Sequence, residues 1–234
     1  HLLDRMKQWR WLALPAAALA LLAGAAWILS PGSLRREAAS LAVLPFVNED
    51  ADPALEPLAD GIAEDLTRRL SRAAGPAFKV LAHSLVRGLR NPSDGLDGTA
   101  RRLGVKLVLL GRYSERGGRL VVTAELIDAG DRTQLWSARY ERQPGELQAI
   151  QAEISQEIAG RLVRRLPPEQ SAEITRRDTE NPEAYRDYLR GRFHWNKRTG
   201  AGISEAIRDF QKAIEADPRY ARAHAGLADA YAVI

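Results

Sequence analysis

The sequence predicts an α+β protein in which one transmembrane helix precedes a mixed-sheet domain and helical hairpins follow it. A long uncharged apolar run near the N-terminus indicates the transmembrane helix. Apolar strand-like runs alternate first with helical patterns and then with each other, in the order β-α-β-α-β-β-β-α. The expected parts are the end of an upstream domain at 1–10, the transmembrane helix at 11–34, the α+β domain at 40–166, a linker at 167–180 and the hairpins at 181–234.

The apolar run lies between Arg10 and Arg35 and contains 24 uncharged residues, 11–34. A helix of that length would be about 36 Å long, and a bilayer has a hydrocarbon core of about 30 Å. Pro31 and Gly32 would end the helix. The run therefore predicts one membrane span.

Basic residues predict the orientation of that span. Arg5, Lys7 and Arg10 precede it and two arginines follow it, which favours a cytoplasmic N-terminus and a body on the other side. A cleaved signal peptide that starts at Met6 is the alternative, because small residues at 24–26 resemble a cleavage site.

Periodicity predicts the elements of the α+β domain. Residues 41–46 are apolar on both faces, as in a buried strand, and Pro45 should end the pairing of that strand. Leucine and isoleucine recur every four residues from Leu58 to Leu70, which is typical of an amphipathic helix. The same reasoning predicts strands at 78–82, 107–113, 120–127 and 136–140, and helices at 98–103 and 147–166.

Composition limits the chemistry. There are 34 Lys and Arg residues against 30 Asp and Glu, and the charges are interspersed, so we expect a mixed solvated surface and no direct nucleic-acid binding by this segment. The chain has no cysteine, which excludes disulfides, thiolate metal sites and cysteine nucleophiles.

No catalytic, cofactor or metal site is predicted. The histidines are few and have no metal-binding spacing; they are His1, His83, His194 and His224. Ser84 follows His83 without an evident orienting acid, so the logic of a catalytic triad is missing. Asp60, Glu64 and Asp65 lie near a helix start, where carboxylates mainly favour the helix dipole.

The C-terminal part contains an internal repeat. Asn181-Pro182 and Asp217-Pro218 each introduce a helical segment and lie 36 residues apart, whereas tetratricopeptide units repeat at about 34 residues. One complete unit and a truncated second unit are expected, with further repeats beyond the chain. The turn at 198–202 makes the first unit about three residues longer than usual. The expected signature residues are Gly191, Ala206, Phe210, Ala213, Pro218, Leu227, Ala228 and Tyr231.

Aromatic residues recur at helical spacing in the first helix of that unit. Such residues usually form the core of a repeat, but an exposed member could line a peptide groove, and Tyr188 and Trp195 are the candidates.

Residues 40–166 resemble the TolB amino-terminal-like domain of bacterial membrane-anchored signalling proteins. The matching pieces are 41–46, 58–62, 103–105, 124–128 and 134–136, and residues 181–199 resemble the first tetratricopeptide unit of the same proteins. The resemblance implies an upstream effector: a serine/threonine kinase, a nucleotide cyclase or a CadC-like winged-helix regulator. Kinase motifs are absent from these residues, so kinase activity cannot be assigned to them.

The function predicted is that of a non-catalytic sensory and scaffold segment of a single-pass protein of the bacterial inner membrane, with residues 35–234 in the periplasm. Its repeats would bind a protein or peptide partner, and the chain could form a homo-oligomer. A secreted TolB-like envelope protein is an alternative, and no cofactor is expected.

Overall fold

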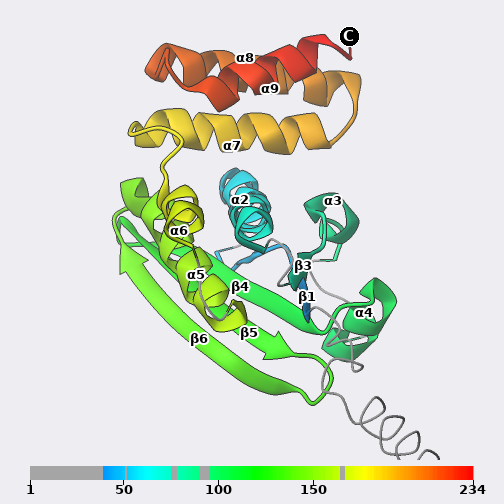
Figure 1. Ribbon diagram of the computed structural model, residues 1–234. Coiled ribbons are helices and arrows are strands. Elements are labelled where there is room, and N and C mark those ends of the chain that lie inside the picture. The colour runs from blue at the N-terminus through cyan, green and yellow to red at the C-terminus, as the bar shows by residue number, and fades with distance from the viewer. Residues whose placement is uncertain (1–38, 51, 75–77, 90–94, 164–166, 234) are drawn as a thin grey trace, which may run out of the picture. The chain divides into compact units, whose positions relative to one another are not determined.

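The computed structural model describes residues 39–50, 52–74, 78–89, 95–163 and 167–233. Ala39–Ile234 form one compact unit. Its described residues form a six-stranded sheet and eight α-helices, with the last three helices stacked above the rest in Figure 1.

The sheet is mixed, and its strand order is β3-β1-β4-β5-β6 with β2 also paired to β4. Strand β1 is parallel to both β3 and β4, whereas β4, β5 and β6 form an antiparallel meander. The strands are β1 (Ala39–Val43), β2 (Val47–Asn48), β3 (Phe78–Val80), β4 (Leu107–Arg116), β5 (Arg119–Asp128) and β6 (Thr133–Arg142).

Pro45 interrupts the first strand as its missing N–H requires. Val43 pairs with Leu109 and Val47 pairs with Arg112, so the segment resumes its pairing with β4 after the break. The strand expected at 41–46 therefore ends at Val43, and β2 begins just beyond the expected range.

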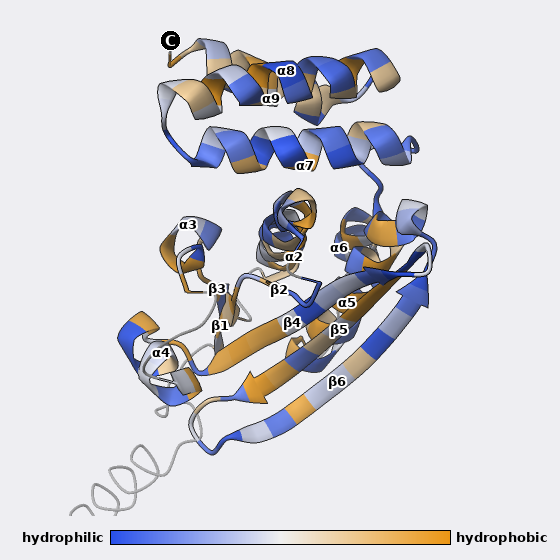
Figure 2. Ribbon diagram, turned by 180° about the vertical axis from the view of Figure 1, so that it is seen from behind, coloured by the Kyte–Doolittle hydropathy of each residue, from blue (hydrophilic) through white to orange (hydrophobic). Residues whose placement is uncertain are grey.

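Helices cover both faces of the sheet to different extents. The larger core lies under α2 (Glu56–Ala74), α5 (Leu147–Leu162) and α6 (Pro168–Thr175). A smaller core on the other face includes Val86 of α3 (His83–Val86) and Ala100 of α4 (Gly95–Leu103). Figure 2 shows hydrophobic residues concentrated on β4 and β5, whereas hydrophobic and hydrophilic residues alternate along β6. Short 3-10 turns at Pro53–Leu55 and Pro144–Glu146 lead into α2 and α5.

The hairpin helices are α7 (Pro182–Asn196), α8 (Gly200–Ala216) and α9 (Ala221–Tyr231). Helix α7 packs on α2, and the virtual Cβ of Gly61 in α2 would lie 2.7 Å from Leu189 Cδ2 of α7. A glycine at this point lets the two helix backbones approach closely. The hairpin thus shares the larger core with the sheet domain.

The predicted fold class, α+β with one transmembrane helix, is wrong. The described residues form a mixed α/β fold around a six-stranded sheet, and none of their helices is long and apolar enough to cross a membrane. The longest, α2, has 19 residues and carries Arg68, Arg69 and Arg72. The predicted span, 11–34, lies outside the described residues. The predicted single-pass location in the inner membrane depended on that span, and this prediction is also wrong.

Two helices were not expected. The predicted linker contains α6, whose Ile174 is fully buried in the larger core. Helix α3 follows β3 directly and buries Val86 in the smaller core. Each has eight residues or fewer, which is too short for a helical period to stand out in the sequence.

The close contact between Gly111 and Phe46 predicts a large effect of a single methyl group. A Cβ at Gly111 would lie 2.0 Å from Phe46 Cε1, so Gly111→Ala should lower the free energy of unfolding by about 2 kcal/mol. Urea denaturation measures the change. The matched control is Gly160→Ala in α5, where nothing lies within 4 Å and stability should rise by up to about 1 kcal/mol. Equal effects of the two substitutions would contradict this packing.

Candidate recognition site at the helical hairpin

Phe210 of α8 is the centre of the hairpin. Its ring is fully buried, and it lies between Gly191 of α7 and Gly226 of α9. A Cβ would approach the ring to 2.6 Å at Gly191 and to 2.7 Å at Gly226. Only glycine leaves room for the ring at these two positions, so the three helices converge on one aromatic side chain.

The predicted signature residues fall into two groups. Gly191, Ala206, Phe210 and Ala213 are buried where α7, α8 and α9 meet. The later residues lie nearer the surface, with Leu227 partly buried and the others exposed; these are Pro218, Ala228 and Tyr231. The carbonyl of Pro218 accepts a hydrogen bond of 2.9 Å from His224 Nε2.

The two predicted groove aromatics have different surroundings. Tyr188 is only 4% exposed and packs against the rings of Phe210 and Tyr220, with centroid distances of 5.8 and 5.2 Å. Trp195 is partly buried near the end of α7. Trp195 is therefore the more exposed of the two side chains.

Two arginines approach the ring of Trp195. The guanidinium carbons of Arg192 and Arg198 are 4.8 and 3.5 Å from the ring centroid of Trp195. Arg198 has a φ of 54°, and the next residue, Thr199, caps α8 by accepting a hydrogen bond from the Gly202 N–H. The tight turn after α7 thus places Arg198 over the indole, where a cation is attracted by the ring face.

A depression of about 340 Å³ lies where the end of α7 approaches α2 and α3. It is lined by Asp60, Arg87, Phe193, Asn196 and Lys197. Lys197 Nζ is 4.7 Å from the ring centroid of Phe193. Two cations, an amide and an aromatic ring therefore line one opening together with the carboxylate of Asp60, which is only 3% exposed. The two cations outnumber this carboxylate, and the set suits an acidic side chain with an apolar neighbour.

Asp60 and His83 form a buried pair that sequence reasoning missed. Asp60 Oδ1 lies 3.4 Å from His83 Nε2, and the two side chains are 3% and 9% exposed. Because 23 residues separate them, no spacing rule could have paired them. Ser84 is the helical neighbour of His83, and adjacent residues on a helix point in different directions, so the three residues do not form a catalytic triad.

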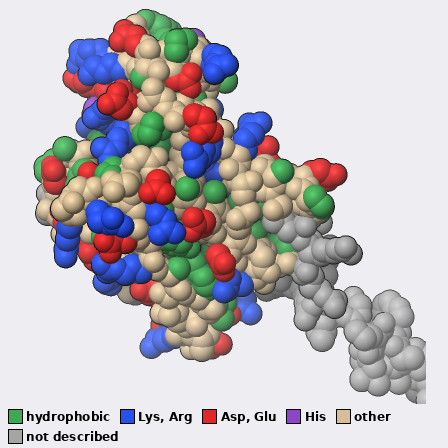
Figure 3. Space-filling view, turned by 90° about the vertical axis from the view of Figure 1, so that its left-hand side faces the viewer, with side chains coloured by type: hydrophobic (Ala, Val, Ile, Leu, Met, Phe, Trp, Pro, Cys, Tyr) green, Lys and Arg blue, Asp and Glu red, His purple; other side chains and the backbone are tan. Residues whose placement is uncertain are grey.

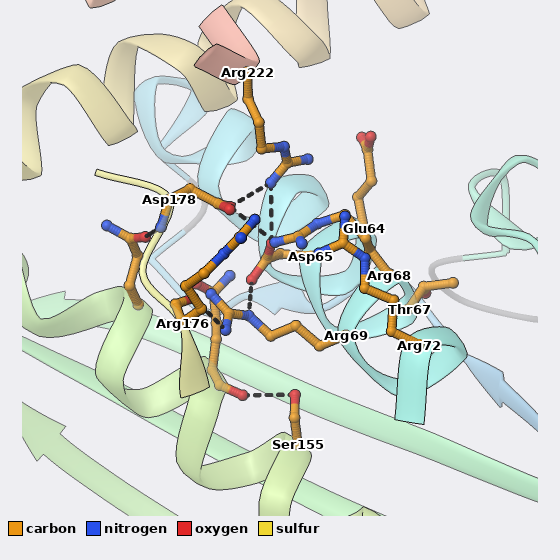
Figure 4. Close-up of polar contacts among 12 residues, drawn as sticks. Glu64, Asp65, Thr67, Arg68, Arg69, Arg72, Ser155, Arg176, Asp178 and Arg222 are labelled. Carbon is orange, nitrogen blue, oxygen red and sulfur yellow. Dashed lines mark hydrogen bonds and ion pairs between the residues drawn. The ribbon is translucent and has the colours of Figure 1, made fainter. Parts of the chain in front are cut away.

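A buried charge network fastens the hairpin to the sheet domain (Figure 4). Asp65 of α2 is 2% exposed; it pairs with Arg68 and accepts a hydrogen bond of 2.6 Å from Arg69 Nε. Arg222 of α9 reaches Asp178 at 2.6 Å and Asp65 at 3.4 Å. Arg68 also donates to Asp178 at 2.9 Å. Side chains from α2, α9 and the segment after α6 therefore share one charge cluster.

Neutral groups extend the network into α5 and α7. The Tyr185 hydroxyl of α7 donates to Gln151 Oε1 of α5 at 2.7 Å. Gln148 of α5 accepts from the Asp178 N–H at 3.0 Å and donates to the Thr179 carbonyl at 2.8 Å. Buried polar groups need such partners, so the orientation of the hairpin is over-determined.

The charges of the network shift the pKa of its members. Burial raises the pKa of Asp65, but the attraction of Arg68, Arg69 and Arg222 outweighs it, and the pKa falls from 3.8 to about 2. Burial also raises the pKa of Tyr185 well above its ordinary value, with a further contribution from the Asp65 charge. Asp65 is thus ionised and Tyr185 neutral at physiological pH.

The described residues contain no group of three or more His, Asp or Glu side chains that could hold a metal ion. His194 Nδ1 lies 2.7 Å from Asp209 Oδ2. This contact joins α7 to α8 and gives the histidine a structural role in the hairpin.

The sheet domain matches a known family. A family described as HilA/YgeH-like transcriptional regulator, second domain, matches residues 37–158, which is more than half of the 234 residues. The chain belongs to this family. The match covers most of the predicted α+β domain, and it agrees with the expectation of a segment from a regulatory protein.

A curated relative and several solved structures are also similar. A protein named putative adenylate cyclase 3, from Rhizobium meliloti (strain 1021), is 32% identical over 188 residues. The alignment covers 80% of this chain and 32% of the relative, so the chain spans about a third of that protein's length.

Two solved structures of bacterial proteins are also similar to part of this chain. Lipoprotein GNA1162 from Neisseria meningitidis is 21% identical, with 52% of this chain and 99% of that chain covered and a TM-score of 0.38. TolB from Acinetobacter baumannii is 16% identical, with 56% and 29% covered and a TM-score of 0.41.

Asp65→Asn should destabilise the chain strongly. The substitution preserves shape but leaves Arg69, which is 1% exposed, without its anionic partner, and breaking a buried pair costs about 3 kcal/mol or more. Urea denaturation at neutral pH measures the loss. Asp229→Asn on the exposed side of α9 is the control and should change stability by less than about 0.5 kcal/mol. A loss of the same small size at Asp65 would contradict the network.

The stabilising effect of Asp65 should depend on pH. Its pKa is 3.8 ordinarily and about 2 in the folded chain, so its contribution is fully present above about pH 4 and is lost as the pH falls toward 2. The shift corresponds to about 2 kcal/mol. Thermal unfolding of the wild type and Asp65→Asn at several pH values between 5 and 2 measures it. The gap between the two proteins should narrow as the pH falls, and a constant gap would refute the assignment.

Proposed function

We propose that this chain is a non-catalytic module of a larger regulatory protein and binds a protein or peptide partner through its helical hairpin. The hairpin would be the first unit of a tetratricopeptide array, as the signature from Gly191 to Pro218 predicts. The observation that carries the proposal is the pair of arginines around Trp195, next to a depression with two further cations.

The position of the site supports recognition by rigid docking. Helix α7 packs on α2, and Glu64 of α2 accepts hydrogen bonds of 2.9 and 2.6 Å from Arg192 of α7. Trp195 and Arg192 are thereby held in place before a partner arrives, which lowers the entropy cost of binding.

The chemistry of the site favours an acidic partner segment. Arg87, Lys197 and Arg198 carry positive charge, and the rings of Phe193 and Trp195 supply apolar contact area. Tryptophan and arginine are the residues most often responsible for binding energy at protein interfaces. A peptide with Asp or Glu beside a large apolar residue fits these groups.

The effector of the whole protein remains a separate proposal. The family match is to a domain of transcriptional regulators, and the curated relative is named as a putative cyclase, so the regulated output would lie in a domain upstream of this segment. The family favours a winged-helix regulator, and the relative favours a nucleotide cyclase. A serine/threonine kinase is supported only by the resemblance of residues 40–166 to the TolB amino-terminal-like domain of signalling proteins.

Selection from a random peptide library on the 234-residue chain tests the binding site. Selected peptides should be rich in Asp and Glu with an apolar residue nearby. Lys197→Glu/Arg198→Glu should weaken their binding at least tenfold, or about 1.4 kcal/mol, and Trp195→Ala should do the same. Fluorescence anisotropy with labelled peptides measures the affinities.

The control makes the same charge change elsewhere on the hairpin. Arg208→Glu/Lys212→Glu places two negative charges on exposed positions of α8 and should leave the affinity within twofold of the wild type. Peptides without acidic residues, or equal losses in the two double variants, would count against the site at the end of α7.

A further inference from the structure

Strand β6 forms an edge of the sheet. It pairs with β5 from Arg142 to Thr133, and no strand among the described residues pairs with its other side. The unpaired N–H and C=O groups of an edge strand are a template for another chain. Proline often protects such edges, but β6 contains none, and Pro144 comes after the end of the strand.

A groove lies between this edge strand and α5. The chain turns back after β6, so α5 runs antiparallel to it: Arg142 Nη2 lies 3.8 Å from Glu153 Oε2, and the Arg161 guanidinium carbon lies 5.8 Å from the Trp136 ring centroid. The groove has a volume of about 330 Å³ and is lined by Trp136, Ala138, Tyr140, Glu153, Gln156 and Glu157.

The floor of the groove is apolar and uneven. Trp136, Ala138 and Tyr140 are alternate residues of β6, so their side chains share the face that α5 covers in part. Trp136 and Tyr140 are 8% and 9% exposed, and the small, partly exposed Ala138 lies between them. The dip over Ala138 can hold an aliphatic side chain of an added strand.

The helical wall of the groove is acidic. Glu153 and Glu157 lie one turn apart and are 46% and 51% exposed. Their partners Arg142 and Arg161 are each 43% exposed, and ion pairs this exposed are weak and exchange readily. Burial is the largest cause of the raised pKa of Tyr140. The two carboxylates raise this pKa further, by more than the two arginines lower it. The lining of the groove thus contains two carboxylates and no basic residue.

We propose that the groove between β6 and α5 binds an extended basic segment of a partner protein, which adds to the sheet as a strand beside β6. Alternate side chains of the segment face the groove: an aliphatic one over Ala138 and, beyond it, two Lys or Arg residues that are two positions apart. Residues two apart in a strand are about 7 Å apart, and Glu153 and Glu157 are separated by a rise of about 6 Å, so both carboxylates can be engaged at once. This surface is separate from the site at the end of α7.

The test uses the full 234-residue chain and a labelled nonapeptide, Lys-Thr-Lys-Thr-Val-Thr-Lys-Thr-Lys. Its lysines and valine lie on one face when it is extended. Fluorescence anisotropy should show saturable binding, and the amide resonances of β6 should shift on titration. In a second copy of the peptide, N-methyl groups replace the backbone N–H hydrogens that would point toward β6. This copy keeps the charge but loses those donors, and it should bind at least tenfold more weakly.

The variants separate the groove from general attraction between charges. Glu153→Gln/Glu157→Gln should weaken binding at least tenfold. Glu205→Gln/Glu215→Gln removes the same charge from α8 and should leave the affinity within twofold of the wild type.

Four results would overturn the proposal. They are no binding at millimolar peptide, equal weakening by the two double variants, undiminished binding of the N-methylated peptide, and concentration-dependent self-association that protects β6 in place of the peptide. The last would identify a second copy of the chain as the occupant.

Discussion

A buried carboxylate surrounded by three guanidinium groups is the constraint on which the rest of this structure depends. Asp65 lies in α2, and Arg222 reaches the same cluster from α9. A buried ion that loses its partners is costly, so α9 cannot move away from α2 without a large loss of stability. The sheet domain and the hairpin therefore behave as one rigid unit, although their sequences suggest two separate parts.

This rigidity determines which surfaces are available for recognition. Lys197, which follows α7, and Arg87, which follows α3, line the same depression, so the basic depression exists only because the hairpin is docked. At the edge of the sheet, the apolar side chains of β5 that belong to the larger core are more deeply buried than Trp136 and Tyr140 of β6, and the acidic groove lies open between β6 and α5. Charges of both signs are otherwise interspersed over the face in Figure 3. Two local concentrations of opposite charge thus stand out from a mixed surface, and they suit two chemically different partners.

Local patterns in the sequence predicted much of the secondary structure and little of the site. The apolar run in β4, the alternation in β5 and the four-residue period in α2 are local signals that survive tertiary packing. The small residues around Phe210 were also evident, because close helix packing needs glycine and alanine at fixed spacings. By contrast, the pairs between Asp60 and His83 and between Asp65 and Arg222 join residues far apart in the chain, and no local pattern encodes them. Tyr188 and Trp195 share a helical spacing, yet tertiary contacts bury the first and leave the second partly exposed.

Native-state hydrogen exchange tests the rigid unit most directly. Amides in the middle of α2, α7 and α9 should exchange with one common free energy of opening, and Asp65→Asn should lower the protection of all three helices together. For the amides of β4 and β5, the substitution should lower the free energy of exchange by no more than it lowers the global free energy of unfolding. If α7 and α9 open with a much lower free energy than α2, the hairpin is an independent part and the account of a single fastened unit is wrong.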